Sequence, residues 1–247
     1  MMVVKVEMEK KSSDGGGRDG CARVRHLAVI PDGNRRYACK KGLAAWFGHE
    51  NGIRKMKDVA VWAFKDFGIK TLTIYAFSTE NFKRSETEVR KLMELFAKTF
   101  EQMKNDVVLH ENRVRVAFIG KRSMLPLRVR KSINDIEKET KDYDDHVLNI
   151  AIAYDGREEI VAAARKLAKS SNQKITAKAF ERALWLSGNT PDLIIRTSGE
   201  RRLSGFLLWQ ASYSELYFSK KLWPEFGKRD LKAALDDFKR RHMRFGK

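Results

Sequence analysis

The chain has 247 residues, of which 43% are hydrophobic, and it carries a formal net charge of +18 at pH 7. This length fits one α/β domain, or at most two small ones. No stretch approaches the roughly 18 continuous apolar residues of a membrane span, and Cys21 and Cys39 have no metal-binding or redox spacing. These features exclude a helical membrane protein and a disulfide scaffold, and they predict a cytoplasmic protein.

The positive charge has several interpretations that charge alone does not separate. It is compatible with a nucleic-acid partner, with peripheral contact to an anionic membrane, with a site that collects two diphosphates, or with a generally basic surface. The chain has no recognisable nucleic-acid-binding motif, and its aromatic residues lie mainly within apolar patterns. We therefore expect no nucleic-acid partner and leave the other three interpretations open.

The order of segments along the chain predicts one domain. Residues 1–22 are charged and glycine-rich without the apolar core of a signal peptide, so we expect a disordered tail followed by a single domain over 23–247. Helical patterns separate most of the apolar runs that follow, which predicts an α/β fold with a mostly parallel six-stranded sheet flanked by helices. These runs are 27–30, 72–77, 114–119, 147–154, 193–195 and 216–218.

A turn follows the first apolar run and ends in two arginines. Asp32-Gly33-Asn34 precedes Arg35 and Arg36, and in open α/β sheets ligands bind at the carboxyl ends of strands. A carboxylate among anion-binding donors suits magnesium, which binds one or two carboxylates together with substrate phosphates. The alternative is an ordinary Asp-Gly turn.

Two helices are indicated further along the chain. Ser85 and Glu88 form a capping-box pattern, and an apolar stripe at helical spacing follows them. Residues 230–242 have the pattern of a basic amphipathic helix. The stripe consists of Val89, Leu92, Met93, Phe96, Phe100, Met103 and Val107.

A second polar loop follows the run at 193–195. It contains Arg196, Arg201 and Arg202 together with Ser198 and Ser204. Guanidinium groups and hydroxyls at the end of a strand suit a phosphate or diphosphate. The alternative is a basic surface turn.

Five motifs, in order and in register, resemble the cis-prenyltransferase family from residue 26 to the C-terminus. They are HLAVIPDGNRRY (26–37), GHENG (48–52), TIYAFSTENFKR (73–84), DLIIRTSGERRLSGFLLWQ (192–210) and SELYF (214–218). The resemblance implies a magnesium-dependent isoprenyl diphosphate synthase that condenses isopentenyl diphosphate with an allylic diphosphate. It also implies a homodimer and an apolar tunnel, partly walled by the long helix, for the growing chain.

The resemblance assigns roles by position. Asp32 binds magnesium and acts in catalysis with Asn81, and Glu215 is a second metal carboxylate from the same or the partner subunit. Arg196, Arg202 and Ser204 bind isopentenyl diphosphate. Arg244 and Gly246 complete this site across a dimer interface. The allylic diphosphate contacts Gly33, Asn34, Arg35 and Arg36, and His49 lies beside that site. Ser78 and Glu80, which follow a strand with Asn81, and the nearby Arg84 are further substrate-binding residues. The alternatives are a structural, helix-capping role for His49 and a surface position for Glu215.

Two positions depart from the family pattern. Ala45 stands where an arginine is usual, which removes one contact to the allylic diphosphate, and Arg201 replaces a histidine of bacterial members. Both leave open a short-chain or irregular condensation. A non-catalytic partner subunit is a second alternative, although it would not need Asp32. The side chains that could close the tunnel and set product length include Ala76, Phe96, Phe100 and Leu148.

Overall fold

The computed structural model describes residues 23–169, 174–188 and 190–241, and its centre is a six-stranded sheet in the order β3-β4-β2-β1-β5-β6. Every strand pair is parallel, so the predicted sheet is confirmed and is parallel throughout. The strands are β1 (His26–Ile30), β2 (Thr71–Ser78), β3 (Val114–Ile119), β4 (His146–Tyr154), β5 (Leu193–Arg196) and β6 (Glu215–Phe218).

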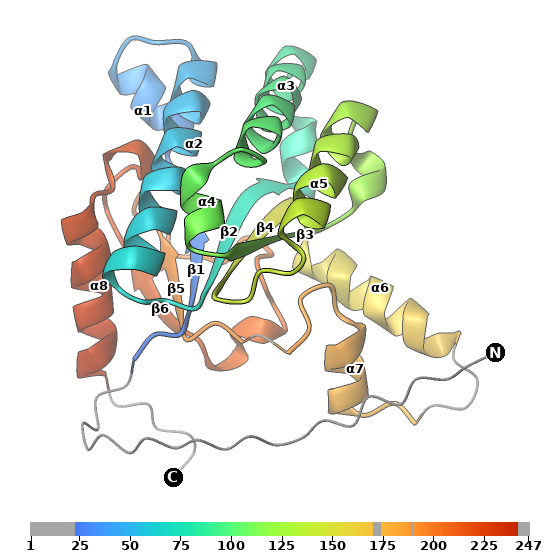
Figure 1. Ribbon diagram of the computed structural model, residues 1–247. Coiled ribbons are helices and arrows are strands. Elements are labelled where there is room, and N and C mark those ends of the chain that lie inside the picture. The colour runs from blue at the N-terminus through green and yellow to red at the C-terminus, as the bar shows by residue number, and fades with distance from the viewer. Residues whose placement is uncertain (1–22, 170–173, 189, 242–247) are drawn as a thin grey trace.

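Helices cover the sheet (Figure 1). The larger core forms where α2, α3, α5 and α8 pack on the strands, and smaller clusters involve α6, α7 and residues 203–211. The α-helices are α1 (Asn34–Lys40), α2 (Ala45–Val61), α3 (Glu86–Met103), α4 (Val107–Glu111), α5 (Leu127–Thr140), α6 (Gly156–Ala168), α7 (Ala177–Ala183) and α8 (Lys228–Arg240). Shorter helical turns are η1 (Trp62–Asp66, a π-helix), η2 (Thr79–Lys83), η3 (Arg122–Met124), η4 (Gln210–Tyr213) and η5 (Trp223–Glu225).

The long helix α3 begins where its sequence predicts but ends earlier. The Ser85 side chain accepts a hydrogen bond from the Glu88 backbone N–H. The prediction that Val107 continues the apolar stripe is wrong, because α3 ends at Met103 and Asp106 caps a new helix, α4. Val107 begins that helix and is 63% exposed.

The last helix, α8, begins before the predicted range. Asp230 Oδ2 accepts a hydrogen bond from Gly227 N at 2.8 Å, so the helix starts at Lys228 and extends to Arg240. The predicted tail over 1–22 and the C-terminal residues from 242 onward lie outside the described residues. Within the described ranges, no helix is long and apolar enough to cross a membrane.

The strand order brings the two polar loops together. β1 pairs with β2 on one side and with β5 on the other, which makes the gap between β1 and β5 a topological switch point. Ile30 is in register with Arg196, and both strands end at the same edge of the sheet. The loop that follows β1 therefore lies beside the loop that follows β5.

At the opposite edge, the His26 side chain is buried at the start of β1. Its Nε2 lies 2.8 Å from Thr73 Oγ1, and burial lowers the pKa of His26 to about 4 against the opposing effect of the nearby Asp192 charge. Protonation of this ring is therefore unfavourable in the folded chain.

We predict that His26 makes folding stability fall as the pH drops from about 6.5 to about 4. In that window the unfolded chain binds a proton that the folded chain does not, and the difference corresponds to about 3 kcal/mol. The free energy of unfolding of the His26→Gln variant, measured with urea, should therefore fall less between these pH values than that of the wild type. Equal pH dependence of the two proteins would contradict this assignment.

Candidate active site

An ion pair joins the two loops at the carboxyl edge of the sheet. Arg196 Nη2 donates to Asp32 Oδ2 at 2.9 Å, and Arg196 Nη1 donates to Ser204 Oγ at 2.8 Å and to the Arg202 carbonyl. The Arg196 side chain is only 6% exposed. Its Nε is buried and has no hydrogen-bond partner within the described residues. A buried donor without a partner is costly, so this guanidinium is suited to a bound anion.

The backbone of the first loop is fixed by residues far away in sequence. Asp32 N donates to Thr197 Oγ1 at 2.9 Å, while Thr197 Oγ1 and Trp223 N donate to the Asp32 carbonyl. Gly33 has φ 105°, and a Cβ there would lie 2.9 Å from Leu222 Cδ2. The loop conformation therefore requires glycine at this position.

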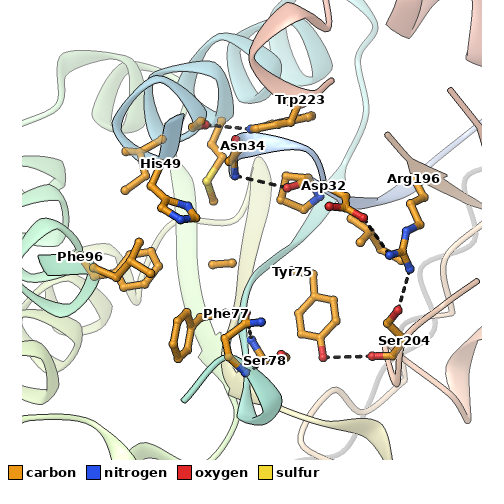
Figure 2. A pocket seen from close by; sticks show the side chains of 18 of the residues that line it. Asp32, Asn34, His49, Tyr75, Phe77, Ser78, Phe96, Arg196, Ser204 and Trp223 are labelled. Carbon is orange, nitrogen blue, oxygen red and sulfur yellow. Dashed lines mark hydrogen bonds and ion pairs between the residues drawn. The ribbon is translucent and has the colours of Figure 1, made fainter. Parts of the chain in front are cut away.

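The GHENG motif brings α2 against α1. A Cβ on Gly48 would lie 2.0 Å from the Asn34 carbonyl oxygen, and a Cβ on Gly52 would lie 2.4 Å from Asn34 Oδ1. Trp223 Nε1 also donates to the Gly52 carbonyl at 2.8 Å. These contacts leave His49, on the same helix, facing the pocket (Figure 2).

The carboxylate of Glu88 lies close to three basic side chains. Glu88 Oε1 lies 3.1 Å from His49 Nε2 and 3.0 Å from Arg84 Nη1, and Arg35 Nε lies 3.9 Å away. Burial lowers the pKa of His49, although the hydrogen bond to Glu88 acts to raise it. From the sequence, Glu88 was assigned only to the helix cap. Its side chain instead contacts Arg84, four residues earlier, and His49, which only the packing of α2 beside α3 brings near.

Ala45 lies one turn before His49 on α2, at the start of that helix. The missing arginine would therefore have emerged on the same side of α2 as His49. Arg35, held at the edge of the Glu88 cluster, is a nearby cation. Trp46 next to Ala45 stacks on Phe47.

The turn after β2 is closed by Ser78 and Asn81. Ser78 N donates to Asn81 Oδ1 at 3.0 Å, and Asn81 N donates to Ser78 Oγ at 3.2 Å. Both residues line the pocket together with Arg84. Glu80 does not line it: its side chain is 67% exposed and pairs with Lys83.

The remaining arginines lie at the rim of the two loops. Arg36 Nη2 donates to Ser198 Oγ and lies 3.5 Å from Glu200 Oε1. The Arg202 side chain is exposed and also pairs with Glu200, so only its carbonyl contacts Arg196 in this structure. Ser198 and Ser204 have positive φ angles of 77° and 51°, which marks the second loop as strained.

A polar pocket of about 210 Å³ lies between these loops and helices (Figure 2). The predicted catalytic and substrate-binding residues that line it are Asp32, Asn34, His49, Ser78, Asn81, Arg84, Arg196 and Ser204. Gly33, Arg35, Arg36 and Arg202 do not line it. It adjoins a larger cavity of about 580 Å³ that extends between α2, α3 and the sheet. The four side chains shared by the two are Ile53, Met56, Ala76 and Phe96. Ala76, Phe96, Phe100 and Leu148, the predicted candidates for closing a tunnel, all line the larger cavity.

Comparison with known proteins identifies the family. The family profile described as "Putative undecaprenyl diphosphate synthase" matches residues 30–246. The chain belongs to the cis-prenyltransferase family. This confirms the resemblance and, with it, the prediction of an enzyme that makes polyprenyl diphosphates.

Relatives of this cis-prenyltransferase include an archaeal and a bacterial protein. A Methanocaldococcus jannaschii protein named tritrans,polycis-undecaprenyl-diphosphate synthase (geranylgeranyl-diphosphate specific) is 45% identical, over 90% of this chain and 82% of its own length. An isoprenyl transferase of Thermus thermophilus is 46% identical, over 90% of this chain and 89% of its own length. The crystal structure of lavandulyl diphosphate synthase from Lavandula x intermedia in complex with dimethylallyl diphosphate is also similar, with a TM-score of 0.87 and 36% sequence identity. The match covers 91% of this chain and 98% of that chain.

The donor set of this cis-prenyltransferase fits magnesium only if substrate phosphates contribute. The Asp32 carboxylate lines the pocket, and its Oδ2 accepts from Arg196. The described residues contain no group of three or more His, Cys, Asp or Glu side chains that could hold a metal. Magnesium typically binds one or two carboxylates and completes its shell with water and phosphate oxygens, which matches this arrangement.

Glu215 does not lie beside Asp32 within one chain. It pairs in register with Leu193, which pairs with Leu27, so it is at the opposite end of the sheet from the loop after β1. Its Oε2 accepts from Arg241 Nη1 at 2.6 Å. The prediction that Glu215 binds the metal together with Asp32 of the same subunit is therefore wrong. That Glu215 of the partner subunit does so stays a prediction, as do the roles of Arg244 and Gly246, which lie outside the described residues.

We predict that Glu88→Gln lowers the pKa of His49 further, because it removes the negative charge that favours the imidazolium. It should also lower the free energy of unfolding by roughly 1.5–3 kcal/mol, the range for hydrogen bonds to charged groups. NMR titration of the His49 ring and urea unfolding measure the two effects.

Glu86→Gln is the matched control, since Glu86 is an exposed carboxylate in the same first turn of α3. If both variants give the same His49 pKa and the same stability, Glu88 does not organise the cluster.

Proposed function

We propose that this cis-prenyltransferase condenses isopentenyl diphosphate with an allylic diphosphate in a magnesium-dependent reaction that elongates a polyprenyl chain. The observation that carries the proposal is the junction between the polar pocket, with Asp32 and Arg196, and the larger cavity. A prenyl diphosphate needs both surroundings, because its head is an anion and its tail is apolar. Burial stabilises the tail by about 0.8 kcal/mol for each CH₂ group removed from water.

The two loops would bind two different diphosphates. Arg196 and Ser204, which are already hydrogen-bonded to each other, suit the diphosphate of isopentenyl diphosphate, with Arg202 turning inward from its pair with Glu200. The allylic diphosphate would bind near Asn34 and α1, with Arg35 and Arg36 at the rim. His49 and Arg84 face this pocket from the side of Glu88.

The reaction requires stabilisation of charge as the allylic C–O bond breaks. Electron density moves to the departing diphosphate, and fixed guanidinium groups stabilise it more in the transition state than in the ground state. Magnesium, held by Asp32 and the substrate phosphates, would supply Lewis-acid stabilisation of the same group. Asn81, fixed by Ser78 at the end of β2, would orient the reacting carbons. A new C–C bond forms, pyrophosphate leaves and isopentenyl diphosphate loses one proton.

The structure favours elongation over the alternatives. A non-catalytic partner subunit would have no need of the Asp32–Arg196 pair or of a pocket that joins a larger cavity. A short-chain or irregular condensation has one observation in its favour, the likeness to a lavandulyl diphosphate synthase. A cavity of about 580 Å³ beyond the pocket is more than a five-carbon primer occupies. The archaeal relative's specificity makes geranylgeranyl diphosphate the first primer to test.

The purified protein should therefore be incubated with magnesium, labelled isopentenyl diphosphate and dimethylallyl, farnesyl or geranylgeranyl diphosphate. Chromatographic sizing and NMR assignment of the products then decide between hypotheses. Long products with new cis double bonds support the proposal. A single irregular condensation product supports the second candidate, and no product with any primer supports a partner subunit.

We predict that Asp32→Ala and Asp32→Asn each lower kcat by at least about 100-fold, which is typical for removing a group that acts electrostatically on the transition state. The Asn variant keeps a side chain that can accept a hydrogen bond from Arg196. A loss of kcat in both variants would therefore show that the negative charge of Asp32 is what the reaction needs. Glu225→Gln is the control, because Glu225 pairs with Lys40 of α1 outside the pocket. Turnover of the Asp32 variants close to that of the control would contradict the role of Asp32.

We also predict a homodimer whose sites use the C-terminal Arg244 and Gly246 of the partner subunit. Deletion of residues 243–247 should raise the KM for isopentenyl diphosphate far more than that for the primer. Mixing Asp32→Ala protomers with truncated protomers should restore partial activity, since one of the two sites in each mixed dimer is then intact. A monomer in sedimentation, or no recovery on mixing, would refute the shared site.

A further inference from the structure

The larger cavity extends from the diphosphate pocket toward the opposite edge of the sheet. Ile53 of α2 and Phe96 of α3 line both spaces, whereas Phe64 of η1 and Met103 at the end of α3 line only the larger one. Both helices lead away from the pocket. The far end of the cavity therefore lies between the C-terminal halves of α2 and α3.

The lining changes from apolar to polar on the side of the cavity that meets water. Near the pocket and along the sheet the side chains are apolar, for example Ile74, Leu148 and Ile150. The polar exceptions gather where α2 faces the end of α3 and the turn that follows it, and most are exposed. They are Arg54, Lys57, Gln102, Asn105 and Asp106, and the remaining polar side chain of the lining is Thr99 of α3.

One ion pair spans this opening. Lys57 Nζ on α2 lies 2.7 Å from Asp106 Oδ2, and the two side chains are 62% and 16% exposed. The carboxylate is fixed, since Asp106 Oδ1 also accepts from Val108 N at 3.0 Å and so caps α4. Lys57 has a flexible stem of methylene groups that can lie along apolar surface. The opening is thus bounded by one rigid partner and one movable partner.

We propose that the Lys57–Asp106 ion pair closes the outlet of the cavity and thereby sets the chain length at which elongation stops. This inference rests on the proposed function, because the occupant is the hydrocarbon end of the growing polyprenyl chain. A methylene added inside the cavity leaves water, which favours binding. A methylene that passes between Lys57 and Asp106 must separate the pair and then enters water near the exposed Val107. The driving force for further elongation therefore falls when the chain reaches the pair.

Two substitutions open the outlet without removing the local structure. Lys57→Met keeps a long side chain and removes the charge, and Asp106→Asn removes the charge but keeps a good helix cap. Each should shift the products by one or more isoprene units toward greater length. The fraction of products longer than the main wild-type product should rise by about threefold, within the range that a partly exposed ion pair can contribute.

Lys65→Met is the matched control. Lys65 lies 3.9 Å from Glu111, so it also joins the end of α2, through η1, to α4, but neither residue lines the cavity. Products of Lys57→Met and Asp106→Asn that match those of Lys65→Met in length, or that are shorter, would overturn the proposal. Thermal unfolding of all three variants shows that they fold.

A binding series separates this inference from the proposed function. Calorimetry with prenyl diphosphates of increasing length, in the absence of isopentenyl diphosphate, should show the affinity of the wild type levelling off at a shorter chain than that of Lys57→Met. This result would support the outlet even if the wild type failed to condense the substrates, which would contradict only the proposed function. Identical affinity profiles would refute the outlet.

Discussion

The ion pair between Asp32 and Arg196 depends on β1 and β5 being adjacent and parallel. These residues are 164 positions apart in the chain, yet the register of the two strands places them at the same edge. Thr197 and Trp223 then fix the backbone of Asp32. The position of α1, the packing of α2 on Asn34 and the direction of His49 all follow from this loop. A change of strand order would separate the two halves of the site.

Each of five arginines of the site lies near a carboxylate, although the five share only three carboxylates. Asp32, Glu88 and Glu200 each lie near at least one arginine. The shortest nitrogen–oxygen distance of each arginine to a carboxylate is between 2.5 and 3.9 Å for Arg35, Arg36, Arg84, Arg196 and Arg202. In the proposed reaction a diphosphate would therefore compete with these carboxylates, and magnesium held by Asp32 would reduce the competition. The large net charge of the chain is thus not a measure of unpaired charge at the site.

Apolar runs and the polar turns after them predicted the sheet and the two loops, because these depend on local patterns. The other polar residues of the pocket, such as His49, Ser78, Asn81 and Arg84, came from the family resemblance and not from a local pattern. Apolar runs of strand length ended in Asp32 and Arg196, and parallel strands place such ends together. Glu88 was missed because its partners, His49 and Arg84, come together only when α2 packs beside α3. Glu215 was misplaced within the subunit because its metal role came from the resemblance alone. The predicted run 216–218 already puts Glu215 at the amino end of its strand, whereas Asp32 follows the carboxyl end of its own. Val107 was assigned to α3 because its spacing continued the stripe, whereas the Asp106 cap had already started another helix.

The contacts of α2 are unequal on its two sides. Toward α1 and η5, Gly48 and Gly52 leave no room for a side chain, and Trp223 holds the backbone of Gly52. Toward the end of α3, across the cavity, it is joined by the side chains of Lys57 and Asp106. In the proposed reaction, adjustment to a longer hydrocarbon would therefore occur where α2 faces the end of α3, and the diphosphate pocket would keep its shape. The head group would then keep one geometry through successive condensations while the tail it carries increases in length.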